Sequence, residues 1–258
     1  MKANWYKGFE VVVVSDLEDL CDKAAERVAR FITDRVQARG RAAIVLSGGA
    51  TPRRLYERLA TGTYQKAIPW GQVYLFWGDE RCVPPDHPDS NYKMAYDTLI
   101  TKVPIPKENI HRMHAERSDL REAALEYEET LRTFFGLFGE GWPRFDLALL
   151  GMGADGHTAS LFPGSPALAE KERWVAATYI EKLKVYRMTL TPPVFNHSAQ
   201  VIFLVAGKEK APVMKELFIA DRRSKRFPFQ EIRPHEGKLI FLLDQDAASL
   251  SPPFCKVS

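Results

Sequence analysis

The densest group of residues that could carry out chemistry is the segment 151–163, which reads GMGADGHTASLFP. Three glycines lie close together in it, and Asp155 and His157 are two residues apart. A histidine exchanges protons near neutral pH, so it can take a proton from water and return it to a leaving oxygen. Taken alone, the pattern also fits an Asp-Gly turn with a capping histidine. The glycines favour close approach of a ligand, and His157 is therefore a candidate acid–base residue.

A second candidate site is the segment 47–52, which reads SGGATP and lies between a predicted strand and a predicted helix. Pro52 suits the first turn of that helix, and Thr51 can cap it. The unpaired N–H groups and the positive dipole end of a helix start favour a phosphate. An ordinary tight turn is the alternative, because the segment matches neither the P-loop nor the dinucleotide motif.

Three charged residues follow an apolar run in the segment 78–81, which reads GDER. The guanidinium of Arg81 can bind a phosphate or a carboxyl-like oxygen with two hydrogen bonds. Asp79 and Glu80 could hold Arg81 in position or hydrogen-bond sugar hydroxyls. The alternative is a solvated loop end.

Other catalytic arrangements find little support in the sequence. No G-x-S-x-G nucleophile motif is present. His111 and His114 lack a supporting pattern of carboxylates or thiols, and Cys82 fits a passive small residue. We therefore expect neither a metal nor a cofactor, and direct attack by water on an activated electrophile such as a lactone.

Composition and net charge narrow the possible cellular locations and binding partners of the protein. The chain of 258 residues is 45% hydrophobic and 27% charged, with a net charge of +3 and three widely spaced cysteines. No signal peptide or membrane-spanning run is evident, which together with the cysteines favours a cytoplasmic protein. The basic cluster at 222–226 fits a solvated loop. We expect a small anionic ligand, no nucleic acid, no membrane, and a monomer or weak homo-oligomer.

The elements that must position these residues alternate between short apolar runs and amphipathic stretches. This pattern predicts one α/β domain over residues 1–258, Rossmann-like with three layers and a mainly parallel sheet. Ligands of such sheets bind beyond the carboxyl ends of the strands, where all three candidate segments fall. Strands are predicted over 11–14, 42–46, 73–77, 145–150, 187–190, 201–205 and 239–243, and helices over 17–36, 52–59, 90–100, 118–134 (capped by Ser118), 208–219 and 245–250.

In their order along the chain, these segments resemble the 6-phosphogluconolactonase family. The resemblance covers most of the chain, although residues 169–186 match poorly and residues 251–258 have no counterpart. Its pieces are LSGGATP (46–52), WGDERCVP (77–84), DHPDSNY (86–92), the whole of 151–163, RMTLT (187–191), GKEKA (207–211) and LLD (242–244) followed by Ala247 and Ala248.

The resemblance implies the fold of the glucosamine-6-phosphate deaminases. It also implies hydrolysis, without a metal, of 6-phospho-D-glucono-1,5-lactone to 6-phospho-D-gluconate in the oxidative pentose phosphate pathway. By position, His157 resembles the catalytic histidine, Asp155 its partner and Arg81 an arginine near the reacting end. The residues that would bind the phosphate are Ser47, Gly48, Gly49, Thr51, Arg187 and Lys210, with Lys208 as the alternative to Lys210.

Two other functions are weighed against this one. Glucosamine-6-phosphate deaminases follow the Asp-Gly-His segment with a run that contains a glutamate, whereas residues 158–163 here read TASLFP. A sugar-phosphate-binding regulator without catalysis is the second alternative. The joint presence of Asp155, His157 and Arg81 argues against it.

Overall fold

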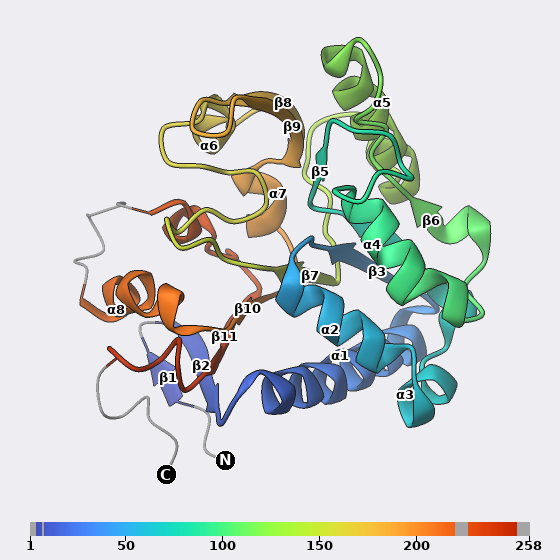
Figure 1. Ribbon diagram of the computed structural model, residues 1–258. Helices are drawn as coiled ribbons and strands as arrows, with labels where there is room; N and C mark the ends of the chain where they lie inside the picture. Colours follow the sequence, from blue (N-terminus) through green and yellow to red (C-terminus); the bar gives the residue numbers. More distant parts are fainter. Residues whose placement is uncertain (1–3, 7, 220–226, 252–258) are drawn as a thin grey trace.

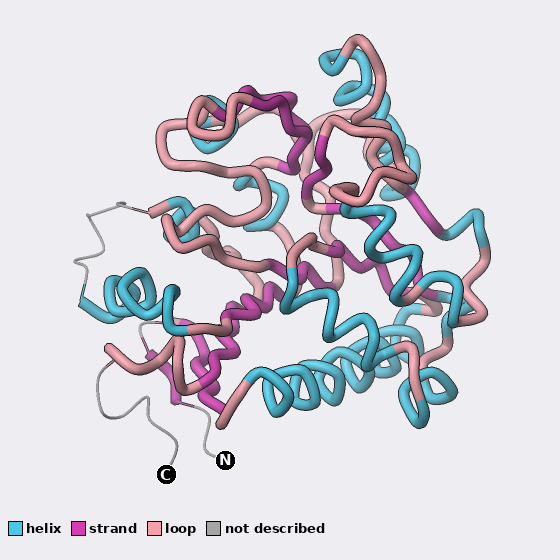
Figure 2. Tube along the Cα trace, in the orientation of Figure 1, coloured by secondary structure: helices cyan, strands magenta, loops and turns pink. Residues whose placement is uncertain are grey.

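The computed structural model describes residues 4–6, 8–219 and 227–251 (Figures 1 and 2). Its main sheet has eight strands in the order β1-β2-β11-β10-β7-β3-β4-β6. All neighbours pair in parallel except β1 and β2, which are antiparallel. The predicted mainly parallel α/β sheet is confirmed. The strands are β1 (Asn4–Tyr6), β2 (Phe9–Val14), β3 (Ala42–Leu46), β4 (Val73–Trp77), β6 (Ile110–His111), β7 (Leu147–Leu150), β10 (Gln200–Val205) and β11 (Lys238–Asp244).

The central strands are covered on both faces. Every residue of β3, β7 and β10 is buried, which requires helices or loops on each side of the sheet. On one side α1 contacts α2 and α3, and α2 contacts α4 (Figure 1). The helices are α1 (Leu17–Arg39), α2 (Ala50–Leu59), α3 (Gly62–Ala67), α4 (Asn91–Thr98), α5 (Leu120–Phe135), α6 (Pro166–Ala169), α7 (Pro192–Asn196) and α8 (Ala211–Ile219), with 3₁₀ turns η1 (Trp70–Gln72), η2 (Ile100–Lys102), η3 (Lys107–Asn109), η4 (Lys208–Lys210) and η5 (Pro228–Glu231).

The helix ends confirm one predicted cap, Ser90, and correct another, Ser118. The side chain of Ser90 accepts a hydrogen bond from the Lys93 N–H and caps α4, as predicted. Helix α1 ends at Gly40, which takes the left-handed conformation with φ 75°. Helix α5 is capped by Asp119 rather than by Ser118, because the Asp119 carboxylate accepts from two N–H groups of the first turn.

Two other local predictions are wrong. Helix α2 has Gly49 at its N-cap and no capping side chain, so Thr51 lies inside the first turn and does not cap it. Residues 245–250 form consecutive turns rather than a helix. The Asp244 carboxylate accepts a hydrogen bond from the Ala247 N–H at 2.7 Å, which binds the first of these turns to the end of β11.

A second, antiparallel sheet of three strands lies beside the main one. It consists of β5 (Asp79–Arg81), β9 (Val185–Leu190) and β8 (Val175–Ile180), with β9 in the middle. The charged segment that was weighed as a solvated loop end is therefore a strand, in which Asp79 and Glu80 are buried. The strand predicted over 187–190 exists but belongs to this smaller sheet, and β8 was not predicted.

The order of the main sheet places a switch point between β3 and β7. From β3 the chain proceeds to β4 and β6 on one side, and from β7 to β10 and β11 on the other. The loops that leave the carboxyl ends of β3 and β7 therefore diverge, and a crevice opens between them. These loops are the two glycine-rich segments, 47–49 and 151–157.

Candidate active site

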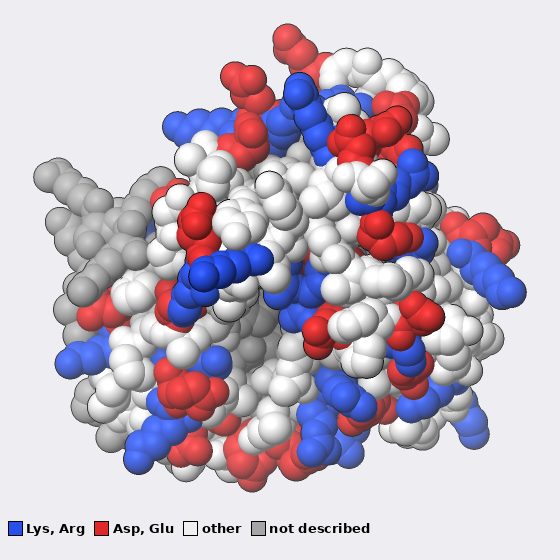
Figure 3. Space-filling view, turned by 45° about the horizontal axis from the view of Figure 1, so that its top comes forward, with Lys and Arg blue, Asp and Glu red and all other residues white. Residues whose placement is uncertain are grey.

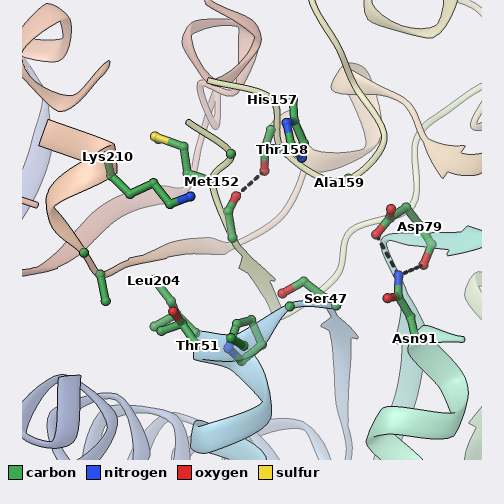
Figure 4. Close-up of a pocket in the computed structure, with 18 of the residues that line it drawn as sticks. Ser47, Thr51, Asp79, Asn91, Met152, His157, Thr158, Ala159, Leu204 and Lys210 are labelled. Carbon is green, nitrogen blue, oxygen red and sulfur yellow. Dashed lines mark hydrogen bonds between the residues drawn. The ribbon is translucent and has the colours of Figure 1, made fainter. Parts of the chain in front are cut away.

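A cavity of about 580 Å³ lies at this switch point. The space-filling view shows the face hollowed near its middle, with basic side chains at the wall of the hollow (Figure 3). The close-up shows side chains converging on it from loops, helices and strands (Figure 4). Of the residues predicted for the site, Ser47, Gly48, Gly49, Thr51, Arg81, His157 and Lys210 line the cavity, whereas Asp155 and Arg187 do not.

The loop after β3 presents its backbone to the cavity in a fixed conformation. The buried Tyr56 hydroxyl accepts from the Ser47 N–H and donates to the Ser47 carbonyl, both at 2.9 Å. A Cβ at Gly48 would overlap the Asn91 side chain, so this position accepts only glycine. The hydroxyl of Ser47 is buried and has no partner among the described residues. An unsatisfied buried hydroxyl beside a cavity indicates a polar ligand.

Two features of this end suit an anion, the start of α2 and the Lys210 ammonium, and the Glu209 carboxylate lies 3.5 Å from the Lys210 Nζ atom. The first turn of α2 carries no acidic side chain, so its N-terminus is open to a negative group. Lys210, in η4, reaches toward the cavity (Figure 4), whereas Lys208 does not line it and is exposed. The Asp244 carboxylate accepts from the Gly207 N–H at 2.9 Å and so fixes the turn that carries Lys210.

His157 and Asp155 form a hydrogen-bonded pair in the loop after β7. The Nδ1 atom of His157 lies 2.5 Å from Oδ1 of Asp155, and the imidazole stacks on Phe162 with ring centres 4.0 Å apart. A Cβ at Gly153 would overlap the imidazole, so a glycine is needed for the ring to lie there. These contacts fix the imidazole plane at the wall of the cavity.

The protonation of the pair follows from the state of Asp155. Partial burial alone would raise the pKa of Asp155, but hydrogen bonds from Lys182 and His157 hold it well below its usual range. The carboxylate is therefore ionised and accepts a hydrogen bond from Nδ1–H of His157. In neutral histidine this tautomer leaves a lone pair on Nε2, which is what a general base requires.

Asp79 and Glu80 make different contacts. The Glu80 carboxylate accepts from the N–H groups of Arg81, Asn91 and Tyr92 and from the Ser90 hydroxyl, which fastens α4 to β5. Burial raises the pKa of Glu80, and these backbone hydrogen bonds oppose that shift. Asp79 lines the cavity, where it accepts from Asn91 at 3.2 Å and from Ser160 at 2.6 Å.

Arg81 and Arg187 are neighbours across the smaller sheet, where β5 and β9 pair them directly. An Arg81 Nη atom donates to the Asp89 carbonyl at 2.5 Å. Burial, and then the charge of Arg81, lower the pKa of Arg187. The Nε atoms of both arginines are buried without a partner among the described residues. Arg81 lines the cavity, so its guanidinium can donate to a ligand there. Burial raises the pKa of the nearby Cys82 thiol to about 11, which keeps it protonated.

Sequence reasoning missed several residues of this site. Asn91 was quoted within the DHPDSNY segment but given no role, although it lines the cavity. Glu209 and Asp244 also line the cavity. They belong to segments that resemble the family but were likewise given no role. Lys182 lies in the stretch 169–186 that matched the family poorly, so no motif pointed to it.

The described residues hold neither a metal-binding cluster nor a helix that could span a membrane. No group of three or more His, Cys, Asp or Glu side chains in them could hold a metal ion. His111 instead stacks on Phe76, with ring centres 4.6 Å apart. Within the same part of the chain, no helix has the length and apolarity needed to cross a membrane. The basic cluster at 222–226 lies outside the described residues.

Comparison with known proteins places the chain among relatives of known name. Residues 15–241 match the family model described as glucosamine-6-phosphate isomerases/6-phosphogluconolactonase. The chain is 43% identical to a 6-phosphogluconolactonase of Synechocystis over 92% of its own length and 96% of that protein. It is 38% identical to one of Nostoc, with 93% and 97% covered.

Solved structures agree with these sequence relatives. A 6-phosphogluconolactonase from Trypanosoma cruzi is 30% identical, with a TM-score of 0.84 and coverage of 96% of this chain and 98% of that one. A monomeric glucosamine-6-phosphate deaminase, at 21% identity and a TM-score of 0.77, shares the fold, with 93% of this chain and 99% of that one covered. The chain belongs to the glucosamine-6-phosphate isomerase/6-phosphogluconolactonase family.

Proposed function

We propose that this protein hydrolyses 6-phospho-D-glucono-1,5-lactone to 6-phospho-D-gluconate, the lactonase step of the oxidative pentose phosphate pathway. The observation that carries the proposal is the placement of the Asp155–His157 pair and an anion-binding loop on one cavity. The 6-phosphogluconolactonase names of relatives at 43% and 38% identity support the same reaction.

In this proposal the phosphate of the substrate binds at the start of α2. The backbone N–H groups of the loop 47–51, the unpartnered Ser47 hydroxyl and the Lys210 ammonium supply donors and positive charge there. Anchoring a group remote from the reacting carbonyl supplies orientation, which lowers KM and supports kcat. Arg187 is paired with Arg81 across the smaller sheet and would add positive charge rather than line the cavity.

At the other end, His157 acts as general base and then as general acid. Its Nε2 takes a proton from water while the water oxygen attacks C1 of the lactone. The carbonyl oxygen becomes an oxyanion, which the Arg81 guanidinium or backbone N–H groups stabilise. When the C1–O5 bond breaks, the protonated imidazole returns its proton to the leaving ring oxygen. The carboxyl product then ionises, and His157 is neutral again.

We also propose that the reaction needs no metal and that the protein is cytoplasmic. Attack by water needs no metal, so a chelator should leave the rate unchanged. The described cysteines, Cys21 and Cys82, are free thiols, which fits a cytoplasmic location.

The test is hydrolysis of freshly prepared 6-phosphogluconolactone, with the spontaneous opening of the lactone subtracted. We expect saturable turnover well above this background. Release of ammonia from glucosamine 6-phosphate would instead identify a deaminase. Tight binding of the sugar phosphate without turnover of either substrate would identify a regulator.

A further inference from the structure

The turn of the β8–β9 hairpin carries a lysine that bonds to the Asp155–His157 pair. The Nζ atom of Lys182 donates to Oδ2 of Asp155 at 2.7 Å, across 27 residues of sequence. The other carboxylate oxygen, Oδ1, meets Nδ1 of His157 at 2.5 Å. The carboxylate is therefore shared between an ammonium group on one side and the imidazole on the other.

We infer that Lys182 is a positioning residue for His157, which acts through Asp155. The inference rests on the proposed function, because it assigns a role within that reaction. Lys182 fixes the rotation of the carboxylate so that Oδ1 remains directed at Nδ1. Its positive charge also offsets the field of the carboxylate, which would otherwise stabilise the protonated imidazole.

The hairpin is built to hold Lys182 in this place. Ile180 and Val185 are paired, and the Ile180 carbonyl accepts from the N–H groups of Leu183 and Lys184 at 3.0 and 2.8 Å. Lys184 takes the left-handed conformation, with φ 54°, which closes the turn. Strand β9 also pairs with β5, which carries Arg81. The position of Lys182 is therefore set by the same small sheet that forms one wall of the cavity.

The exposure of the pair indicates a role in orientation rather than in folding. The Lys182 side chain is 67% exposed and that of Asp155 26% exposed, and ion pairs at such positions contribute little to stability. Among the described residues, Lys182 and His157 are the ones that hydrogen-bond to the Asp155 carboxylate. The side chains packed on the same loop, Phe162 on the imidazole and Phe227 beside Gly156, do not titrate.

The test compares Lys182→Met with Lys184→Met, which removes the same charge from the same turn. For Lys182→Met we expect kcat to fall about tenfold, with KM nearly unchanged. This loss is smaller than the roughly 10²–10⁴-fold that general acid–base catalysis contributes in full. Without the ammonium charge, the imidazole holds its proton to a higher pH. The acidic limb of the kcat/KM profile should then move up by about half a pH unit. Lys182→Arg should restore most of the rate, and Lys184→Met should match the wild type.

The inference is wrong if Lys182→Met and Lys184→Met share one kcat and one pH profile. It is equally wrong if Lys182→Met and Lys182→Arg lose the same activity with the profile unmoved, which would mark a purely structural contact. A titration of the His157 ring by ¹⁵N NMR separates these outcomes from a failure of the proposed function. Even in a protein without turnover, the ring should remain protonated to higher pH in Lys182→Met than in Lys184→Met.

Discussion

The two ends of the cavity are built in different ways. The anchor end consists of the loop 47–51 and Lys210, and its backbone is held by buried groups such as Tyr56 and Asp244. At the reacting end His157 lines the cavity, and Asp155 and Lys182 support it from outside the lining; these three side chains are between 26% and 67% exposed. One end therefore depends on backbone geometry, and the other on a chain of side-chain hydrogen bonds.

This difference separates the expected effects of substitutions. Backbone N–H groups do not titrate, so substitutions at the anchor end should act mainly on substrate binding. A chain of side chains that share protons should act on kcat and on its dependence on pH. If an expected effect were absent, the division between residues that act on binding and residues that act on catalysis would be weakened.

The largest effect is expected from His157→Ala, which removes the proposed base and acid. After the spontaneous opening of the lactone is subtracted, we expect kcat/KM to fall about 10²–10⁴-fold. The matched control is His235→Asn, because His235 is exposed and does not line the cavity. Near-normal turnover in His157→Ala would show that another group activates the water.

The second effect concerns the glycine beneath the imidazole. In Gly153→Ala the new methyl group would overlap the His157 ring and displace it. A displacement of this size should lower kcat about 100-fold while the phosphate still binds. Gly71→Ala is the control, since a Cβ at Gly71 meets nothing within 4 Å. Equal kcat values for the two variants would contradict the placement of the ring.

The third effect tests the anchor end. Lys210→Met should raise KM about 10- to 100-fold, because a hydrogen bond to a charged group is worth about 1.5–3 kcal/mol. The exposed Lys208, two residues away, does not line the cavity, so Lys208→Met should leave KM unchanged. A larger rise in KM from Lys208→Met than from Lys210→Met would assign the phosphate contact to Lys208.

The smallest effect is on stability and depends on pH. Since the pKa of Asp155 is lower in the folded protein than in the unfolded chain, ionised Asp155 stabilises the fold above about pH 4. This contribution is lost as the pH falls through the folded pKa. Asp155→Asn should therefore reduce the free energy of unfolding by about 1 kcal/mol at pH 7, and the difference should begin to shrink only below about pH 4 and continue to shrink toward the folded pKa. A constant difference in urea denaturation across that range would contradict it.

The sequence predicted the main sheet because its strands are buried on both faces and appear as short apolar runs. The run of valines in β2 and the apolar residues 42–46 are examples of this pattern. The same rule placed the segments 47–51 and 151–157 at one edge of the sheet, and the structure puts both on one cavity. Spacing and strand ends were enough for this part of the site.

The remainder depends on contacts between distant segments. Asp79 and Glu80 form a buried strand because Asn91, Ser90 and Ser160 supply hydrogen bonds to their carboxylates, and no local pattern shows these partners. Lys182 was missed for the same reason, since its bond to Asp155 depends on the pairing of β8 with β9.

The most direct test of the account compares two substrates that differ only at the anchor. Wild-type protein is assayed with 6-phosphogluconolactone and with the unphosphorylated gluconolactone, each corrected for spontaneous opening. The account predicts a much higher kcat/KM for the phosphorylated lactone, and a difference that narrows in Lys210→Met. Equal kcat/KM values for the two lactones in the wild type would contradict the claim that the two ends of the cavity act on one substrate.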